Sequence, residues 1–379
     1  MKEYIEFTEK IAAEYRKQRK IPVIGITGSV GKTTVKELAS QILMQKYCVH
    51  KNEESCNGND TVVRNTLSIR AEHQVCVFEL GIDDFGQMER MVQCCRPTIP
   101  VLTGISSTHL EKLENSRNIY DEKSHIFDTL PKQGKVIANG DDENLMRYLY
   151  EDSRIPNENI YTYGLSEQCM LRAEKIISKG LYGSTFTVSG KEFISESFEA
   201  EIKLPGTHMV QNAVAAILIG LLFDVPVEQI VYGLKMMAGT KQRCQVMQNG
   251  NLTIIDDSYN ASPEAVKAAL NLLKQAEGRK VCILGDMNEL GDAEKALHED
   301  IGRYADLAAD ETVFIGTLAE YMYYGAKQQN HCGKISWYAD KDSFMERCAE
   351  HITARDTVLI KASHKQEFWE LSKKVLAAI

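Results

Sequence analysis

A glycine-rich segment near the amino terminus, Gly25–Thr34, has the residue types needed to hold phosphate. It overlaps the end of an apolar run, Ile21–Thr27, and leads into a helical pattern over Thr33–Lys46. In such a strand–loop–helix unit, unpaired amides and the helix dipole attract anions. Lys32 can reach the β and γ phosphates of a nucleotide, and the Thr33 hydroxyl can ligate Mg²⁺. The predicted nucleotide-binding residues of this loop are Gly28, Ser29, Val30, Gly31, Lys32, Thr33 and Thr34.

The loop has the shorter form T-G-x-x-G-K-T. The longer pattern G-x-x-x-x-G-K-[ST] would require a glycine where Ile26 stands. A phosphate loop alone does not separate a kinase, a GTPase, a motor and a ligase. The rest of the chain must therefore decide between these classes.

The elements that position the loop are typical of an α/β protein. Three further apolar runs, Val75–Leu80, Pro100–Ile105 and Lys135–Ala138, are separated by polar or helical sequence. This spacing predicts repeated βα units and a mainly parallel sheet. Residues 160–203 alternate in character and predict a small antiparallel meander, followed by a helix over Asn212–Phe223.

A second α/β pattern begins near Gly239, and its spacing predicts a doubly wound, Rossmann-like arrangement. We therefore expect an amino-terminal helix over residues 1–20, a central P-loop ATP-binding domain over 21–238 and a carboxy-terminal ligase domain over 239–379. The second pattern predicts strands at Leu252–Asp256, Lys280–Leu284, Thr312–Ile315, Ile335–Tyr338 and Thr357–Ile360.

Composition excludes several classes of protein. The 379 residues carry a formal charge of −9, which argues against broad nucleic-acid binding, since that requires a basic face. No stretch reaches the ~18–20 apolar residues of a transmembrane helix, and the amino terminus lacks the apolar core of a signal peptide. The ten cysteines form no CxxC pair. We therefore expect a cytoplasmic protein with mostly buried thiols.

Six motifs, in order and spread over residues 21–379, resemble the Mur ligase family. The resemblance implies an ATP-dependent carboxylate–amine ligase that forms an amide (peptide) bond through an acyl phosphate, with ATP and two Mg²⁺ ions. The two Mg²⁺ ions supply positive charge that offsets the clustered negative charge of a carboxylate and a triphosphate. The motifs are Thr27–Thr34, Phe78–Gly81, Thr108–Glu111, Leu204–His208 with Asn212, Asp256–Pro263 and Leu284–Gly291.

The resemblance also implies site residues in the central domain. Glu79, at the end of a predicted strand, is expected to hold Mg²⁺. His109 is similar to the family histidine near the second metal. Lys123 corresponds to a lysine that is carbamylated in the family and so becomes a carboxylate-like metal ligand. With Thr33 these residues complete the expected metal set, and Asn212 is expected near adenine.

In the carboxy-terminal domain, Arg243 resembles an arginine that contacts ATP phosphate when the domains close, although Gln242 replaces the usual glycine beside it. Asp257 and Asn260 resemble the nucleotide-contacting linker motif. Lys361 and Ser363 are expected to meet the incoming amine or its carboxylate. Their segment, Lys-Ala-Ser-His, departs from the family's Lys-Gly-Ser-Arg at two positions.

Only twenty residues precede Ile21, which is enough for one helix, whereas family members carry a domain there that binds a UDP-sugar. We therefore expect a ligase whose carboxylate substrate is not the usual UDP-muramoyl peptide. A first alternative is a cell-wall ligase that adds D-alanyl-D-alanine, with UDP binding supplied by a partner chain. A second is a P-loop nucleotide switch or kinase.

Overall fold

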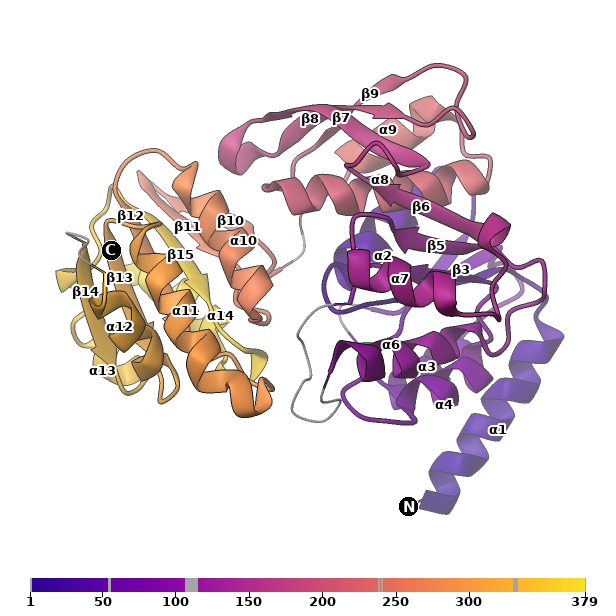
Figure 1. Ribbon diagram of the computed structural model, residues 1–379, viewed down its shortest axis with the longest axis horizontal. Helices are drawn as coiled ribbons and strands as arrows, with labels where there is room; N and C mark the ends of the chain where they lie inside the picture. The colour runs from indigo at the N-terminus through magenta and orange to yellow at the C-terminus, as the bar shows by residue number, and fades with distance from the viewer. Residues whose placement is uncertain are drawn as a thin grey trace. The chain divides into compact units, whose positions relative to one another are not determined.

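The computed structural model describes residues 2–53, 56–105, 115–237, 239, 241–329 and 333–378. The described chain forms two compact units, each built on its own sheet (Figure 1). The first contains residues 2–177, 185–202 and 207–237, and the second is made chiefly of residues 241–378. The predicted α/β class with a mainly parallel sheet is confirmed.

The first unit is built on a nine-stranded sheet with the strand order β2-β3-β1-β4-β5-β6-β7-β8-β9. Strands β1 to β5 are parallel where they pair, so that Ile24 of β1 lies opposite Val77 of β3 and Ile99 of β4. Their carboxyl ends therefore meet at one edge, which is where an open α/β sheet binds ligands. The strands are β1 (Val23–Thr27), β2 (Val49–Lys51), β3 (Val75–Glu79), β4 (Ile99–Leu102), β5 (Val136–Asn139), β6 (Ile160–Gly164), β7 (Leu171–Ser178), β8 (Ser184–Ser189) and β9 (Phe198–Ile202).

One expectation for this sheet is wrong. Strand β6, at the start of the segment predicted as an antiparallel meander, pairs in parallel with both β5 and β7. The crossover through α7 explains the first pairing, because it returns the chain to the same end of the sheet before β6 begins. Strands β7, β8 and β9 then follow one another in the same sheet.

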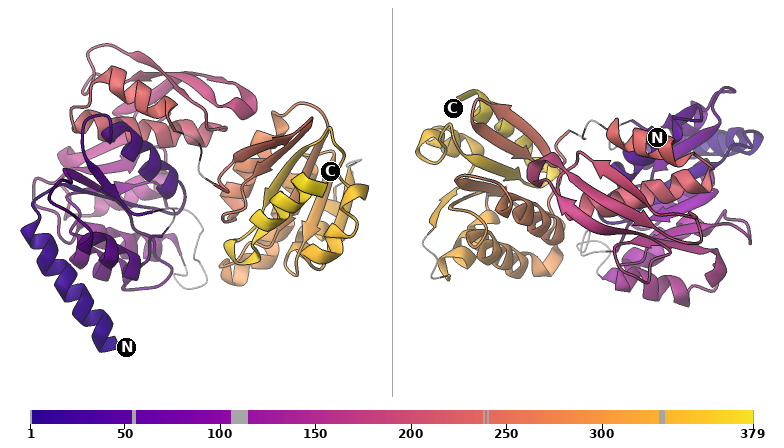
Figure 2. Two further views of the ribbon diagram at one scale, coloured as in Figure 1. Left: turned by 180° about the vertical axis from the view of Figure 1, so that it is seen from behind. Right: turned by 90° about the horizontal axis from the view of Figure 1, so that it is seen from above.

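Helices cover both faces of this sheet (Figures 1 and 2). Helices α3, α4, α6 and α7 share a core with the strands, in which Phe78 and Val136 pack with Met91 and Ile119. Helix α2 packs on β1 and β3 from the other face, together with α8 and α9. The helices are α1 (Lys2–Gln18), α2 (Lys32–Leu43), α3 (Asn59–Leu67), α4 (Gln87–Cys95), α6 (Ser116–Ser124), α7 (Glu143–Glu151), α8 (Thr207–Leu222) and α9 (Val227–Lys235).

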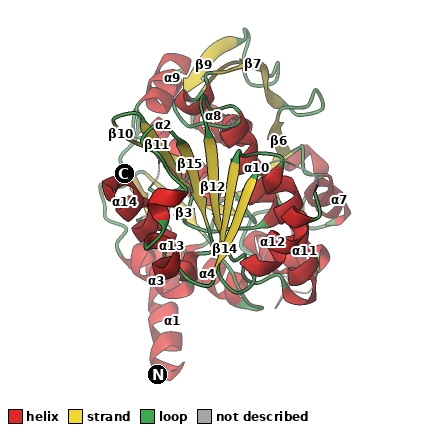
Figure 3. Cartoon of the chain, turned by 90° about the vertical axis from the view of Figure 1, so that its left-hand side faces the viewer, coloured by secondary structure: helices red, strands yellow, loops and turns green. Residues whose placement is uncertain are grey.

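The second unit has a six-stranded sheet with the order β10-β11-β15-β12-β13-β14. The predicted strands are all present and parallel where they pair, and an additional strand, β10, pairs antiparallel with β11. Figure 3 shows these strands as a fan between two groups of helices. The strands are β10 (Gln245–Asn249), β11 (Leu252–Asp256), β12 (Lys280–Gly285), β13 (Glu311–Ile315), β14 (Lys334–Tyr338) and β15 (Thr357–Lys361).

The helices of the second unit pack on both faces of its sheet, with α10, α11 and α12 on one and α13 and α14 on the other. The sequence determines where helix α10 begins. The Ser262 hydroxyl accepts a hydrogen bond from the Ala265 amide, and Pro263 occupies the first helical position. The helices are α10 (Pro263–Lys274), α11 (Glu294–Asp306), α12 (Ala319–Lys327), α13 (Lys341–Met345) and α14 (Phe368–Ala378).

Across the described part of the chain, none of the helices combines the length and apolarity needed to cross a bilayer. The cysteines described there are free thiols, and all but Cys48 and Cys56 are buried.

Candidate active site

The phosphate loop joins β1 to α2 and requires glycine at two positions. Gly28 has φ +143°, and a Cβ atom there would lie 2.2 Å from Thr103 Oγ1. Gly31 has φ +87°, and its Cβ would lie 2.6 Å from Asn212 Oδ1. Any larger residue would clash at these positions and would also strain the backbone. The predicted nucleotide residue Asn212 therefore lies directly against the loop.

The loop is held by the segment that follows β4. The Thr103 hydroxyl donates to the Val30 carbonyl at 2.5 Å, and the Ser29 amide donates to the Gly104 carbonyl at 2.9 Å. Sequence reasoning missed Thr103, because nothing in its local pattern indicates a contact with a loop more than seventy residues earlier.

Lys32 lies folded over the loop that it belongs to. Its Nζ donates to the carbonyl of Gly28 at 2.7 Å and to that of Ser29 at 3.2 Å. The ammonium is thus held at the mouth of the loop, beside the amino terminus of α2, where helix amides attract anions. Thr34, the next predicted residue, is buried in the first turn of α2.

Glu79 ends β3 and meets the first turn of α2. Thr33 Oγ1 donates to Glu79 Oε2 at 2.8 Å, and Asn57 Nδ2 donates to Glu79 Oε1 at 2.7 Å. Asn52 fixes the backbone of Glu79 through two hydrogen bonds of 2.9 and 3.1 Å. A carboxylate beside a hydroxyl is a set of hard oxygen donors that suits Mg²⁺. Asn52 and Asn57 were not predicted from the sequence, because their contacts with Glu79 join positions more than twenty residues apart.

Lys123 is buried near the end of α6, with a side chain only 1% exposed. Burial holds the pKa of its amine well below the ordinary value, the positive charge of Lys32 lowers it further, and Glu122 acts in the opposite direction. The Glu122 carboxylate accepts hydrogen bonds of 2.9 Å from the amides of Gly86 and Met88, so that it holds the start of α4. A neutral amine in such a place can react as a nucleophile.

Helix α8 is tied to the carboxyl edge of the sheet beside the loop. Gln211 Nε2 donates to Asn139 Oδ1 at 2.9 Å and to Asp141 Oδ2 at 2.8 Å. Asn139 ends β5 and Asp141 lies just after it, so these contacts with the edge of the sheet place the neighbouring Asn212 against Gly31.

In the second unit, Arg243 lies 4.0 Å from the centre of the Tyr259 ring, a distance typical of a cation–π contact. Residues on both sides of it are left-handed, with φ 61° at Gln242 and φ 50° at Cys244. Strain of this kind costs on the order of 1–3 kcal/mol at each position and requires support. The Cys244 amide donates to Asp257 Oδ1 at 3.0 Å, and the Tyr259 amide donates to the Gln242 carbonyl at 3.1 Å.

Lys361 closes the same cluster from the end of β15. Its ammonium donates to Asp257 Oδ2 at 2.5 Å, to the Asn260 carbonyl at 2.8 Å and to the Asp257 carbonyl at 3.3 Å. Ser363 is 2% exposed, and its hydroxyl accepts from the Asn288 amide at 2.8 Å. Lys361 thus binds the segment predicted to contact nucleotide, and both side chains are buried within this unit.

His109 falls in 106–114, outside the described residues, and its place near a second metal stays a prediction. Among the described residues no group of three or more histidines, cysteines, aspartates and glutamates is arranged to hold a metal ion. The structure thus brings together Lys32, Thr33, Glu79 and Asn212 in the first unit, and Arg243, Asp257, Asn260 and Lys361 in the second.

Comparison with known families covers both units. Residues 26–220 match the Mur ligase middle domain, and residues 242–364 match the Mur ligase, glutamate ligase domain. The chain belongs to the Mur ligase family. It therefore has the fold of an ATP-dependent ligase, and the switch or kinase alternative is set aside.

Within the Mur ligases, the chain is similar to enzymes named UDP-N-acetylmuramoyl-tripeptide–D-alanyl-D-alanine ligase. The protein of that name from Bacillus subtilis (strain 168) is 30% identical over 372 residues, which cover 97% of this chain and 79% of the relative. The one from Escherichia coli (strain K12) is 26% identical and covers 96% and 78%.

Solved structures of Mur ligases agree with this likeness. A crystal structure of MurF from Acinetobacter baumannii matches with a TM-score of 0.89 and 27% identity, over 98% of this chain and 80% of that one. A MurF ligase from Thermotoga maritima, solved in complex with ADP, has the same fold, with a TM-score of 0.85 at 21% identity over 99% and 85%.

Proposed function

We propose that this Mur ligase joins D-alanyl-D-alanine to a UDP-N-acetylmuramoyl-tripeptide, with ATP as the energy source. The observation that carries the proposal is the similarity to enzymes of that name along nearly the whole chain, through both units. The expectation of a different carboxylate substrate finds no support in these relatives. A partner chain that supplies UDP binding stays a prediction.

The proposed reaction has two steps. A carboxylate oxygen of the tripeptide attacks the γ-phosphorus of ATP, the bond from that phosphorus to the bridging oxygen breaks, and ADP leaves with the electron pair. The amine of D-alanyl-D-alanine then attacks the acyl carbon, phosphate departs and the nitrogen loses a proton. The acyl phosphate is needed because a free carboxylate has no good leaving group.

The phosphate loop fits the first step. The amides at the start of α2 and the dipole of this helix bind the phosphates, and Lys32 turns from its carbonyl partners toward the β and γ phosphates. Its charge then offsets the charge that gathers on the transferred phosphoryl group. Asn212, packed against Gly31, is placed to contact the nucleotide from α8.

Thr33 and Glu79 are the described residues that fit Mg²⁺, since their oxygens already lie within hydrogen-bond distance of each other. Mg²⁺ would supply positive charge to the phosphate oxygens. Asn57 orients the Glu79 carboxylate and Asn52 fixes its backbone, as second partners of metal ligands commonly do.

Lys123 is proposed to carry a carbamate. Its amine adds to CO₂, a carbon–nitrogen bond forms and one proton is released, which leaves a carboxylate on the side chain. Burial and the charge of Lys32 favour the neutral amine that this addition needs. The resulting negative charge would also compensate Lys32, which the free ammonium cannot do.

Arg243, Asp257 and Asn260 are proposed to contact ATP from the second unit, and Lys361 to hold their segment in place. The test is amide formation from the named substrates, with each component omitted in turn. We expect ADP and the joined product only when ATP, Mg²⁺, the tripeptide and the dipeptide are all present. ADP formation that ignores the dipeptide, without a joined product, would refute the proposal.

A further inference from the structure

The first unit has a basic cavity at the end of its sheet opposite the phosphate loop. The cavity has a volume of about 560 Å³, within the range of small-ligand sites. It opens beside Ile21 and Pro22, which lead into β1, whereas the loop begins where β1 ends. Five residues at about 3.3 Å each separate the two sites by roughly 17 Å. A phosphate in this cavity is therefore not the one transferred from ATP.

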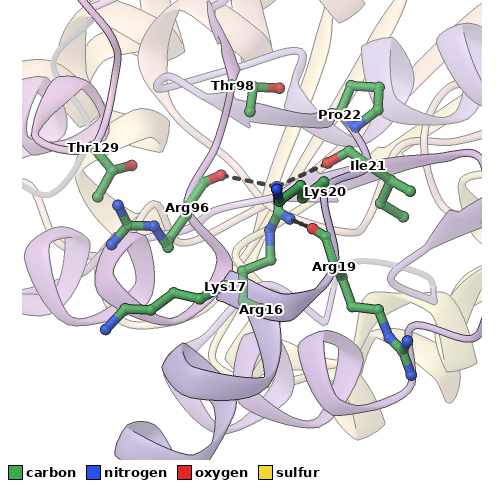
Figure 4. A pocket seen from close by; sticks show the side chains of 9 residues that line it. All are labelled: Arg16, Lys17, Arg19, Lys20, Ile21, Pro22, Arg96, Thr98 and Thr129. Carbon is green, nitrogen blue, oxygen red and sulfur yellow. Dashed lines mark hydrogen bonds between the residues drawn. The ribbon is translucent and has the colours of Figure 1, made fainter.

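Five cationic side chains line this cavity, and none of the described residues that line it is acidic. Four belong to the end of α1 and the residues after it, and the fifth, Arg96, follows α4 (Figure 4). The dipole of a helix stabilises cations in its last turn, which accounts for some of this charge. It does not account for Arg96, which comes from another element. The five are Arg16, Lys17, Arg19, Lys20 and Arg96.

Arg16 builds the wall of the cavity and is only 5% exposed. Its guanidinium donates to the carbonyls of Cys95 at 2.7 Å, Ile21 at 2.9 Å and Arg96 at 3.3 Å, which ties α1 to the end of α4 and the start of β1. No carboxylate of the described residues pairs with it. Burial lowers the pKa of Arg16, and the positive charge of Arg96 lowers it further, whereas Cys76 and Cys95 act in the opposite direction. The wall is therefore rigid and positive.

Two polar atoms of the lining residues have no hydrogen-bond partner within the described part of the chain. These are Arg19 Nε and Thr129 Oγ1, and both are buried. A buried polar atom without a partner costs free energy, and most buried polar atoms in native proteins have one. Lys20 and Arg96 likewise form no ion pair with the described residues. The Arg19 guanidinium packs on the Tyr15 ring and donates to the Tyr15 hydroxyl at 3.0 Å. An anion in the cavity would give the Thr129 hydroxyl an acceptor and would offset the charges of Lys20 and Arg96.

We propose that this cavity binds a small molecule with two or more adjoining phosphates. A single phosphate would fill little of the volume. Adjoining phosphates can contact Arg96 and the cations at the end of α1 at the same time. The guanidinium of Arg96 suits phosphate oxygens, because its planar donors can bind two of them together. Two sources share this chemistry: a free polyphosphate that regulates the enzyme, and the diphosphate of a UDP-linked substrate, which would rest on the proposed function.

The test is calorimetric titration of inorganic pyrophosphate into the full chain, with the phosphate loop already saturated by a non-hydrolysable ATP analogue and Mg²⁺. We expect one additional site, weakened at least tenfold by the double variant Lys20→Gln/Arg96→Gln. The matched control, Lys373→Gln/Lys374→Gln, removes the same charge from an exposed part of α14 and should bind like the unmodified protein. Equal weakening in both variants, or no additional site, would overturn the proposal.

Thr129→Val separates a ligand contact from a structural one. Because the Thr129 hydroxyl has no hydrogen-bond partner among the described residues, its removal should leave the melting temperature of the free protein unchanged or higher. The rise in melting temperature on adding pyrophosphate should become smaller. A lower melting temperature with an undiminished response to pyrophosphate would contradict the site.

Two further titrations distinguish a free polyphosphate from the diphosphate of a UDP-linked substrate. If UDP binds at the same place, with the same loss in Lys20→Gln/Arg96→Gln, and pyrophosphate competes with it, the diphosphate belongs to a nucleotide-linked substrate. If pyrophosphate binds and UDP does not, the ligand is a free polyphosphate. Binding only to vesicles that contain anionic lipid would refute a soluble ligand. None of these measurements requires turnover, so failure of this proposal is distinct from failure of the proposed ligase activity.

Discussion

The Thr33 hydroxyl donates a hydrogen bond to Glu79 Oε2 at 2.8 Å. This contact joins the first turn of the phosphate-loop helix to the end of the adjacent strand β3. Hydroxyl and carboxylate oxygens therefore meet beside the loop, where a metal bound to ATP phosphates would have to lie. The second partner of the carboxylate, Asn57, makes the arrangement testable.

Asn57→Ala should weaken Mg²⁺ binding by about 10–100-fold, because the Glu79 carboxylate loses the donor that orients it. The measurement is the Mg²⁺ dependence of ATP turnover. Asn144→Ala, at an exposed position on α7, is the control and should behave like the unmodified protein. An unchanged Mg²⁺ requirement in the Asn57 variant would show that this contact does not position a metal ligand.

Lys32→Ala should reduce ATP turnover by at least about 10², because the phosphates lose the point charge at the mouth of the loop. The assay is ADP formation under saturating substrates. Lys46→Ala, just beyond the end of α2, is the control, because this exposed lysine contacts only two backbone carbonyls and the Tyr47 ring among the described residues, and should leave turnover unchanged. Turnover at the unmodified rate in Lys32→Ala would remove the basis for assigning the phosphate loop.

Lys123→Ala should lose activity and regain part of it with acetate or formate, since a short carboxylate can stand in for the carbamate. Rescue should depend on carboxylate concentration and should not occur in Lys32→Ala. A fully active Lys123→Ala enzyme without added carboxylate would rule out the carbamate.

The lowered pKa of Lys123 also predicts a dependence of stability on pH. In CO₂-free buffer the unfolded chain holds this proton up to the ordinary lysine pKa, whereas the folded protein releases it at lower pH. Unfolding free energy should therefore rise with pH between the two values. Lys123→Met should be more stable than the unmodified protein at low pH, and this advantage should shrink as pH rises. Urea titrations across pH measure it; a constant difference would contradict the pKa shift.

Lys361→Met should cost about 3 kcal/mol of unfolding free energy, because it removes the ion-pair partner of Asp257 at a site where Lys361 is 3% exposed. Lys267→Met, which breaks a more exposed pair with Asp300, should cost less than about 1 kcal/mol. Urea unfolding of both variants provides the comparison. Equal costs would show that the Lys361 pair does not hold the segment that contains Asp257.

Much of the fold could be predicted from the sequence because it depends on local pattern. The strands β1, β3 and β11 are continuous apolar runs followed by loops, and the structure places them within two residues of the predictions. Strand β10 was not predicted, since its residues are only half-buried at a sheet edge and carry little apolar pattern. The parallel pairing of β6 with β7 depends on the path of the chain through space, which alternation alone does not show.

The site was predictable in its residue types and only partly in its contacts. Gly28, Gly31 and Lys32 were found because the loop is contiguous in sequence. Contacts between distant positions were not found: Lys361 reaches Asp257 across 104 positions, and sequence reasoning assigned them to different ligands.

Amide formation through an acyl phosphate can be tested by following oxygen from the carboxylate into phosphate. UDP-N-acetylmuramoyl-tripeptide labelled with ¹⁸O in its terminal carboxylate is incubated with ATP, Mg²⁺ and D-alanyl-D-alanine, and the products are analysed by mass spectrometry. We expect a joined product together with inorganic phosphate that carries one ¹⁸O atom per amide formed. A joined product with unlabelled phosphate, or ADP formation without any joined product, would contradict it.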